Sequence, residues 1–155
     1  MQDRRPSLAY RALDHQVLAG LADEPALTGQ AGTLTYAQLL HETAVIAGAL
    51  QQLGVGEGAK VAVEVPRGNE QVIAVLALAR IGALPHGTAE QRFVGAPPVY
   101  FPGGEAEPVP WRVLIQAGRT DPAAARPSDS VQYEQVFFDA YEDIFTTLLA
   151  GGTID

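Results

Sequence analysis

Apolar residues recur at helical spacing in three segments of the first half of the chain, at residues 8–21, 35–53 and 69–81. In the first two segments an apolar side chain returns every three or four positions, which gives each predicted helix one apolar face. Thr35 can cap the second helix, because its hydroxyl can accept from a free backbone amide while Gln38 stands at the reciprocal position. The third segment is apolar on nearly every side, which indicates a helix buried against a sheet.

Short runs of β-branched and apolar residues predict strands between and after these helices. The clearest run is KVAVEV at residues 60–65, which Pro66 ends. A further helix is predicted at residues 141–150. The alternation of strands and helices predicts an α/β fold with a mainly parallel sheet flanked by helices. The predicted strands are residues 26–28 and 33–34, which form a hairpin, and residues 60–65, 111–115, 131–138 and 153–154.

Proline marks one long connection in the second half of the chain. Seven of the eleven prolines lie between Pro97 and Pro127. Proline fixes φ and lacks an amide donor, so this stretch is predicted to be loop with at most short strands. The length of 155 residues fits one domain. Its predicted parts are residues 1–93, a Pro/Gly-rich connection at 94–130, and a strand–helix–strand block at 131–155.

Charge and composition exclude several classes of function. Ten Lys and Arg residues stand against eighteen Asp and Glu, a net charge of −8 that repels the phosphate backbone of nucleic acids. The chain has no cysteine, and its three histidines lack the paired spacing of a metal site, so no metal is predicted. No apolar run is long enough to span a bilayer. These features predict a soluble, cytoplasmic protein that binds neither nucleic acid nor membrane.

Four blocks of sequence carry a resemblance to a known superfamily. They are GTLTYAQL at residues 32–39, LQQLGVGEGAKVAV at 50–63, PRGNE at 66–70 and VLALARIGA at 75–83. Together they closely resemble the opening of adenylate-forming enzymes, which include acyl-CoA synthetases and the adenylation domains of nonribosomal peptide synthetases. In that family the next strand reads tyrosine-valine-proline, whereas this chain has LPHGT at residues 84–88. The resemblance implies a truncated N-terminal part of such an enzyme.

A second resemblance lies nearer the end of the sequence. Residues 137–145, FFDAYEDIF, and 148–153, LLAGGT, are similar to the block that follows the phosphate loop in adenylation domains. That block contains an aspartate that holds the α-amino group of an amino-acid substrate, which implies a substrate-binding role for Asp139. Two registers are possible: one keeps Asp139 at that position with a one-residue deletion, and the other, aligned from Phe145, puts Phe138 there.

The acidic residues of this block allow two interpretations. Asp139, Glu142 and Asp143 could supply a carboxylate pair for acid–base chemistry. They could also complement the dipole at the start of the predicted C-terminal helix. We favour the second interpretation and predict no catalytic residue in the chain.

Between its two matching regions the family has a phosphate-binding loop rich in serine, threonine and glycine. This chain has PGGEAE at residues 102–107, without serine, threonine or lysine, and its two glutamates would repel a triphosphate. The resemblance therefore implies a non-catalytic module without a cofactor, in a structural or docking role near nonribosomal peptide synthetase or acyl-ligase machinery. The alternative is part of an adenylate-forming enzyme that activates a carboxylic or amino acid with ATP. Its phosphate loop and catalytic lysine would then come from a partner or a missing region.

A domain of this kind would leave a sheet edge and apolar side chains for another surface to cover. We predict that a peptide-synthetase or acyl-ligase protein, or a second copy of this chain, covers them. The side chains predicted to form this interaction surface are Tyr100, Phe101, Trp111, Tyr141 and Phe145.

Overall fold

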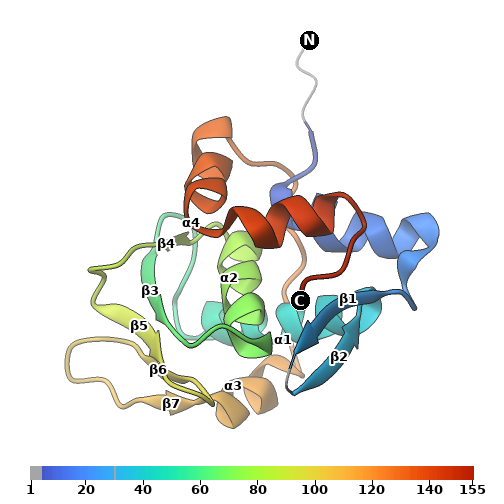
Figure 1. The fold of residues 1–155 in the computed structure, drawn as a ribbon. Helices are drawn as coiled ribbons and strands as arrows, with labels where there is room; N and C mark the ends of the chain where they lie inside the picture. The colour runs from blue at the N-terminus through green and yellow to red at the C-terminus, as the bar shows by residue number, and fades with distance from the viewer. Residues whose placement is uncertain (1–4, 30) are drawn as a thin grey trace.

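The computed structural model describes residues 5–29 and 31–155, and places a five-stranded sheet and a separate two-stranded hairpin around a central helix, α2 (Figure 1). The strands are β1 (Pro25–Gly29), β2 (Gly32–Thr35), β3 (Lys60–Glu64), β4 (Leu84–Pro85), β5 (Gln91–Val94), β6 (Val99–Phe101) and β7 (Val109–Pro110). The helical elements are two short π-helical segments, η1 (Tyr10–Asp14) and η2 (Val17–Leu21), and the α-helices α1 (Tyr36–Gln52), α2 (Asn69–Ile81), α3 (Trp111–Gly118) and α4 (Val131–Leu149).

The five-stranded sheet is mixed, with the strand order β4-β3-β5-β6-β7. β3 pairs in parallel with β4 and β5, whereas β5–β6 and β6–β7 are antiparallel. The predicted α/β class is confirmed, but the sheet is parallel in only half of its pairings. The connection at residues 95–98 explains the difference, because a parallel crossover needs a dozen or more residues. Gly95, with φ of 89°, lies in this tight turn.

Helix α1 begins as its sequence predicts. The Thr35 hydroxyl accepts a hydrogen bond from the Gln38 amide at 3.2 Å, and the Gln38 side chain accepts from the Thr35 amide at 2.8 Å. These two bonds satisfy two amides that the helix itself cannot pair. The helix is followed by Gly54, whose φ of 89° suits glycine.

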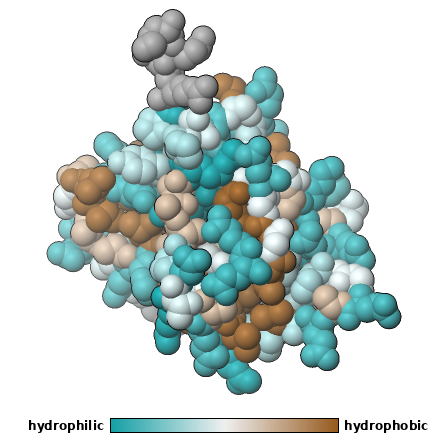
Figure 2. Space-filling view, turned by 180° about the vertical axis from the view of Figure 1, so that it is seen from behind, coloured by the Kyte–Doolittle hydropathy of each residue, from teal (hydrophilic) through white to brown (hydrophobic). Residues whose placement is uncertain are grey.

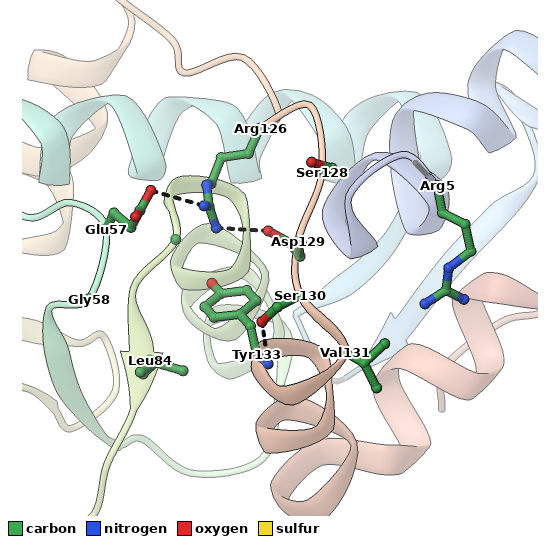
Figure 3. Close-up of a pocket in the computed structure, with 11 residues that line it drawn as sticks. Arg5, Glu57, Gly58, Leu84, Arg126, Ser128, Asp129, Ser130, Val131 and Tyr133 are labelled. Carbon is green, nitrogen blue, oxygen red and sulfur yellow. Dashed lines mark hydrogen bonds and ion pairs between the residues drawn. The ribbon is translucent and has the colours of Figure 1, made fainter. Parts of the chain in front are cut away.

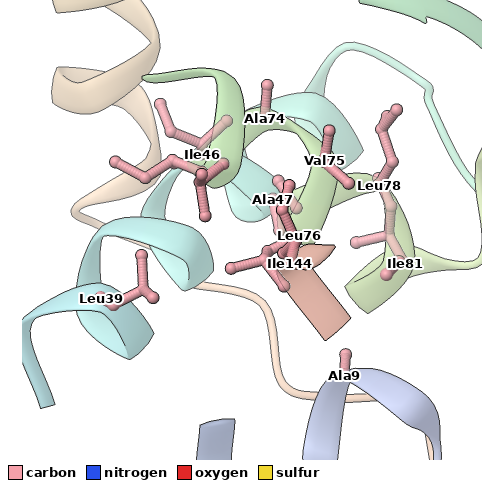
Figure 4. Close-up of a cluster of buried hydrophobic side chains, with 14 of the residues drawn as sticks. Ala9, Leu39, Ile46, Ala47, Ala74, Val75, Leu76, Leu78, Ile81 and Ile144 are labelled. Carbon is pink, nitrogen blue, oxygen red and sulfur yellow. The ribbon is translucent and has the colours of Figure 1, made fainter. Parts of the chain in front are cut away.

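The core lies where α1, α2 and α4 meet (Figure 4). Nearly every side chain of α2 is buried, as the apolar sequence of this helix predicts. Leu76 of α2 is completely buried and lies in this cluster with Ile46 of α1 and Ile144 of α4. Because α2 is buried on all sides, it is the central element against which the other elements pack.

Two segments predicted as strands are helical, and both predictions are wrong. Residues 111–115 lie in α3, whose buried residues Trp111, Leu114 and Gly118 follow a helical period. Residues 131–138 form the first half of α4, which Ser130 caps by accepting from the Tyr133 amide at 3.1 Å.

The other predicted elements, near the two ends of the chain and in the connection, can be compared with the structure one by one. The hairpin predicted at residues 26–34 is present as β1 and β2, although residue 30 of its turn lies outside the described residues. Ile154 forms a parallel bridge with Leu27, so the end of the sequence lies beside β1 (Figure 1). The helix predicted at residues 141–150 is the second half of α4. The connection at residues 94–130 contains β6, β7 and also α3, so it holds more regular structure than expected.

Candidate functional site

A groove of about 940 Å³ lies between β1, the start of α2 and the middle of α4. Helix α4 is bent where it borders the groove, because Tyr141 has the non-helical dihedral angles φ −139° and ψ 43°. The bend separates two helical halves that run in different directions in Figure 1. Residues 139–144 at this bend form one wall, and residues 66–72 at the start of α2 form the other.

The wall at α2 contains a buried polar side chain with an unpaired acceptor. Asn69 is 9% exposed, and its Nδ2 donates to the Gly32 carbonyl at 3.4 Å. Only the amide nitrogen can donate to a carbonyl, which fixes the orientation of the side chain. Its Oδ1 is buried without a hydrogen-bond partner and lies so close to Gly29 that a Cβ there would be 2.6 Å away. A buried acceptor left unpaired costs free energy, so this atom favours a donor.

The wall at α4 carries carboxylates. Asp139, Glu142 and Asp143 are exposed and line the groove, and Glu70 faces them from α2. Asp139 accepts a hydrogen bond from the Gln135 side chain at 2.8 Å. Across the described ranges 5–29 and 31–155, no ion pair involves any of these four carboxylates.

Arg67 is the one basic side chain among the described residues that line the groove. Its guanidinium donates to the backbone carbonyl of Asp155 at 3.3 Å. Asp155 adds a fifth carboxylate, which accepts from the Thr28 hydroxyl at 3.0 Å. The groove therefore presents mainly hydrogen-bond acceptors and negative charge.

A second cavity, of about 600 Å³, lies around Arg126 (Figure 3). The guanidinium pairs with Asp129 at 2.7 Å and with Glu57 at 3.0 Å, and it lies 5.5 Å from the centre of the Tyr133 ring. Asp129 also accepts from the Leu8 amide at 3.0 Å. Burial raises the pKa of the Asp129 carboxyl above its usual value. Because the polar groups pair with one another, this cluster joins distant segments of the chain and offers little to a ligand.

Tyr133 strengthens the same junction from α4. Its hydroxyl donates to the Ala83 carbonyl at 2.6 Å, in the turn after α2. Burial is the main cause that raises the pKa of the Tyr133 phenol, so this hydroxyl stays protonated as the donor. The first half of α4 is therefore fixed to the end of α2 by a hydrogen bond that the sequence did not indicate.

In the glycine pair Gly103–Gly104 of the connection, the Gly104 amide is already hydrogen-bonded within the chain. The Gly104 amide donates to the Glu90 carboxylate at 2.8 Å. The side chain of Glu90 also lies against Gly103, within 2.8 Å of where a Cβ would be placed. Glu105 and Glu107 follow and are exposed. Three carboxylates therefore lie beside or within the loop at residues 102–107.

Three side chains of the predicted sites lie where a ligand or partner could reach them. Asp139 is exposed in the groove, and Tyr141 is half-buried and lines it. Phe101 is 36% exposed and ends β6, a strand that lies on the opposite side of α2 from α4 in Figure 1. These residues therefore do not form one continuous surface.

The other three side chains of the predicted interaction surface are buried, and the prediction is wrong for them. Tyr100 and Trp111 pack with Phe93, whose ring centre is 5.1 Å from that of Tyr100 and 6.0 Å from that of Trp111. Phe145 is completely buried against Phe137, with a distance of 5.5 Å between the ring centres. Large apolar side chains in a proline-rich stretch were expected to be exposed, but short strands and a helix place them in the core. Burial raises the pKa of the Tyr100 phenol to about 12.

No local sequence pattern indicates the α2 wall of the groove. The sequence predicts only that Asn69 begins a helix, whereas in the structure its side chain also contacts the Gly32 carbonyl. The long separation in sequence between Asn69 and the acids of α4 made their meeting unpredictable.

The described residues contain no group of three or more His, Asp or Glu side chains that could hold a metal ion. Within the same part of the chain, each helix is too short or too polar to cross a bilayer.

Residues 13–89 match the family described as AMP-binding enzyme. This segment contains α1, β3 and α2. The acetyl-coenzyme A synthetase of Deinococcus radiodurans is 45% identical over 83 residues, which cover 50% of this chain and 13% of the synthetase. The enzyme of the same name from Streptomyces avermitilis is 41% identical over 87 residues, 53% of this chain and 13% of that protein. The chain thus spans a small part of the length of these relatives.

Solved structures show the same fold over more of the chain. An artificially fused adenylation–PCP di-domain of a nonribosomal peptide synthetase, NpsA-ThdA from Klebsiella oxytoca, superposes with a TM-score of 0.63 at 22% identity. The superposition covers 83% of this chain and 27% of that one. The N-terminal subdomain of NpsA from Klebsiella oxytoca, in complex with 3-hydroxybenzoyl-AMSN, gives a TM-score of 0.62 at 23% identity over 81% of this chain and 35% of the other.

Proposed function

We propose that this chain, whose residues 13–89 match the AMP-binding enzyme family, is a non-catalytic, adenylation-domain-like module with a docking role. Its setting would be nonribosomal peptide synthetase or acyl-ligase machinery, since the similar proteins are synthetases and adenylation domains. The observation that carries the proposal is the hydrogen bond from the Gly104 amide to the Glu90 carboxylate.

A phosphate loop works because backbone amides, hydroxyls and a lysine are free to donate to phosphate oxygens. In this chain a carboxylate already accepts from the Gly104 amide. Glu105 and Glu107 add negative charge within the same loop, and residues 102–107 contain no side-chain hydroxyl or ammonium group. A bound triphosphate would have to displace Glu90 and overcome repulsion from three carboxylates.

The docking part of the proposal rests on the family's architecture and on the acidic surface of this chain. The partner would be a synthetase or ligase protein, or a second copy of this chain. Hydrophilic side chains cover much of the face in Figure 2, and hydrophobic ones lie between them in several patches. Such a mixed surface suits a polar interface with a separate protein.

A second candidate function is supported by Asp139. The resemblance assigns the equivalent aspartate to the α-amino group of an amino-acid substrate, and Asp139 is exposed in a groove that a small molecule can enter. In this alternative the chain contributes the amine-binding residue to an adenylate-forming enzyme. The phosphate loop and the catalytic lysine come from elsewhere.

The test is calorimetric titration of the protein with Mg-ATP, together with pyrophosphate exchange in the presence of amino and carboxylic acids. We expect an ATP affinity no better than millimolar and no exchange. Micromolar ATP binding that substitutions within residues 99–110 abolish would contradict the proposal. The second candidate would be supported by micromolar binding of an amino acid that Asp139→Asn removes. The control, Asp121→Asn at an exposed aspartate elsewhere, should leave that binding intact.

A further inference from the structure

We infer that the groove between β1, the start of α2 and the bend of α4 binds a basic peptide segment of a partner protein. This inference rests on the proposed docking function and names the chemistry of the partner. It is carried by the charge of the groove together with the unpaired buried acceptor on its wall.

The charge of the groove is unbalanced. Five carboxylates line it, with one guanidinium, and that guanidinium is engaged by a backbone carbonyl. The carboxylates of Glu70, Asp139, Glu142 and Asp143 have no ion-pair partner anywhere in the described chain. Cationic side chains entering the groove would gain both Coulomb attraction and charge-assisted hydrogen bonds.

Asn69 adds a polar side chain of fixed orientation to the lining of the groove. Its Oδ1 is buried and unpaired, while its Nδ2 is held by the Gly32 carbonyl. An ammonium or guanidinium group has only donors, which matches an acceptor in this position. A carboxylate or phosphate would meet the wrong polarity at Asn69 and like charge at Asp139 and Asp143.

The spacing of the acids favours several cations on one chain over a single amine. Glu70 lies on the α2 wall and Asp139, Glu142 and Asp143 lie on the opposite wall, on both sides of the bend at Tyr141. One amine can pair with one or two of these carboxylates and leaves the rest uncompensated. A peptide with successive lysines or arginines can place a cation at each wall.

The inference is tested by titrating the full chain with acetylated, amidated tetralysine, which has no free α-amino group. The groove variant is Glu142→Gln/Asp143→Asn, and the matched control is Glu105→Gln/Glu107→Gln, which removes the same charge from an exposed loop. We expect the groove variant to bind the peptide at least 10-fold more weakly and the loop variant to change less than 2-fold. Asn69→Leu, whose side chain is of similar size, should also weaken binding at least 3-fold.

Three outcomes would overturn the inference. An equal loss in both double variants would show attraction to the net charge of the protein alone. Unchanged binding in the groove variant would place the peptide elsewhere. Binding of free lysine as tight as that of tetralysine would identify a small-amine site. Pyrophosphate exchange is measured on the same samples to test the non-catalytic function separately from peptide binding. Exchange activity would contradict the non-catalytic function whether or not the peptide binds.

Discussion

The ion pair between Arg80 and Asp14 gives the sharpest prediction for stability. Arg80 lies in the last turn of α2 with 5% of its side chain exposed, and its guanidinium contacts both carboxylate oxygens of Asp14, at 2.7 and 3.1 Å. The Arg80 Nε also donates to the Ala123 carbonyl at 2.7 Å. One side chain thus joins η1, α2 and the connection before α4.

Replacing Arg80 by methionine keeps most of the apolar stem and removes the charge. Removing one partner of a buried ion pair costs about 3–5 kcal/mol, because the other charge is left uncompensated. The Asp14 side chain is 21% exposed, so water can solvate part of its charge and reduce the cost. The unpaired Ala123 carbonyl adds about 1 kcal/mol. We expect Arg80→Met to lower the free energy of unfolding by about 3 kcal/mol in total.

Urea unfolding followed by far-ultraviolet circular dichroism measures this loss. The matched control is Arg92→Met, since Arg92 pairs with Glu64 at 3.3 Å with both side chains more than 40% exposed. An exposed pair contributes about 0–1 kcal/mol. Combining Arg80→Met with Asp14→Asn should cost less than the sum of the two single substitutions. A loss from Arg80→Met no larger than that of the control would refute the assigned role.

Two further predictions concern the core and the Arg126 cluster. Leu76→Ala should destabilise the protein by about 2–5 kcal/mol, because Leu76 is fully buried between helices, whereas Leu53→Ala at a site 44% exposed should cost under about 1 kcal/mol in the same urea titration. Burial raises the pKa of Asp129 from 3.8, so the folded protein holds this proton more tightly and the contribution of Asp129 to stability falls as the pH rises through the folded pKa. Asp129→Asn should therefore be less destabilising at pH 7 than at pH 4, and an equal or larger loss at pH 7 would contradict this assignment.

The part of the fold that the sequence predicted well is the part governed by local signals. The capping pair of Thr35 and Gln38, the glycine after α1 and the apolar run of α2 each act within a few residues. At residues 131–138 the apolar side chains suit either a strand or a helix. There the Ser130 cap and the burial of Glu134 and Phe137, three positions apart, give the helix, and the second signal exists only in the folded chain.

The candidate site was only half predictable for a related reason. Asp139 was identified from a motif, but its acidic neighbours were interpreted as the first turn of a helix beginning near residue 141. In the structure Glu142 and Asp143 directly follow the bend at Tyr141 and begin the second helical half of α4, as that interpretation predicted, whereas Asp139 lies before the bend. The bend at Tyr141 directs them toward a groove whose other wall is formed about 70 residues earlier in the chain. Neither the bend nor this contact follows from local sequence.

Only one wall of the groove lies in the segment that matches the AMP-binding family, so the side chains of the other wall can change without a change of fold. The α2 wall, including Asn69, lies within residues 13–89, which match the AMP-binding family. The acidic wall lies on α4, beyond that segment. Its carboxylates are exposed and do not belong to the hydrophobic core. Core side chains such as Leu76 and Ile144 belong to one buried cluster that packs α2 against α4. Substitutions at Asp139, Glu142 and Asp143 can therefore change what the groove binds without changing how the helices pack. For the same reason the groove and loop double variants should both unfold within about 0.5 kcal/mol of the unmodified chain, so that a difference in peptide binding reports on the groove itself.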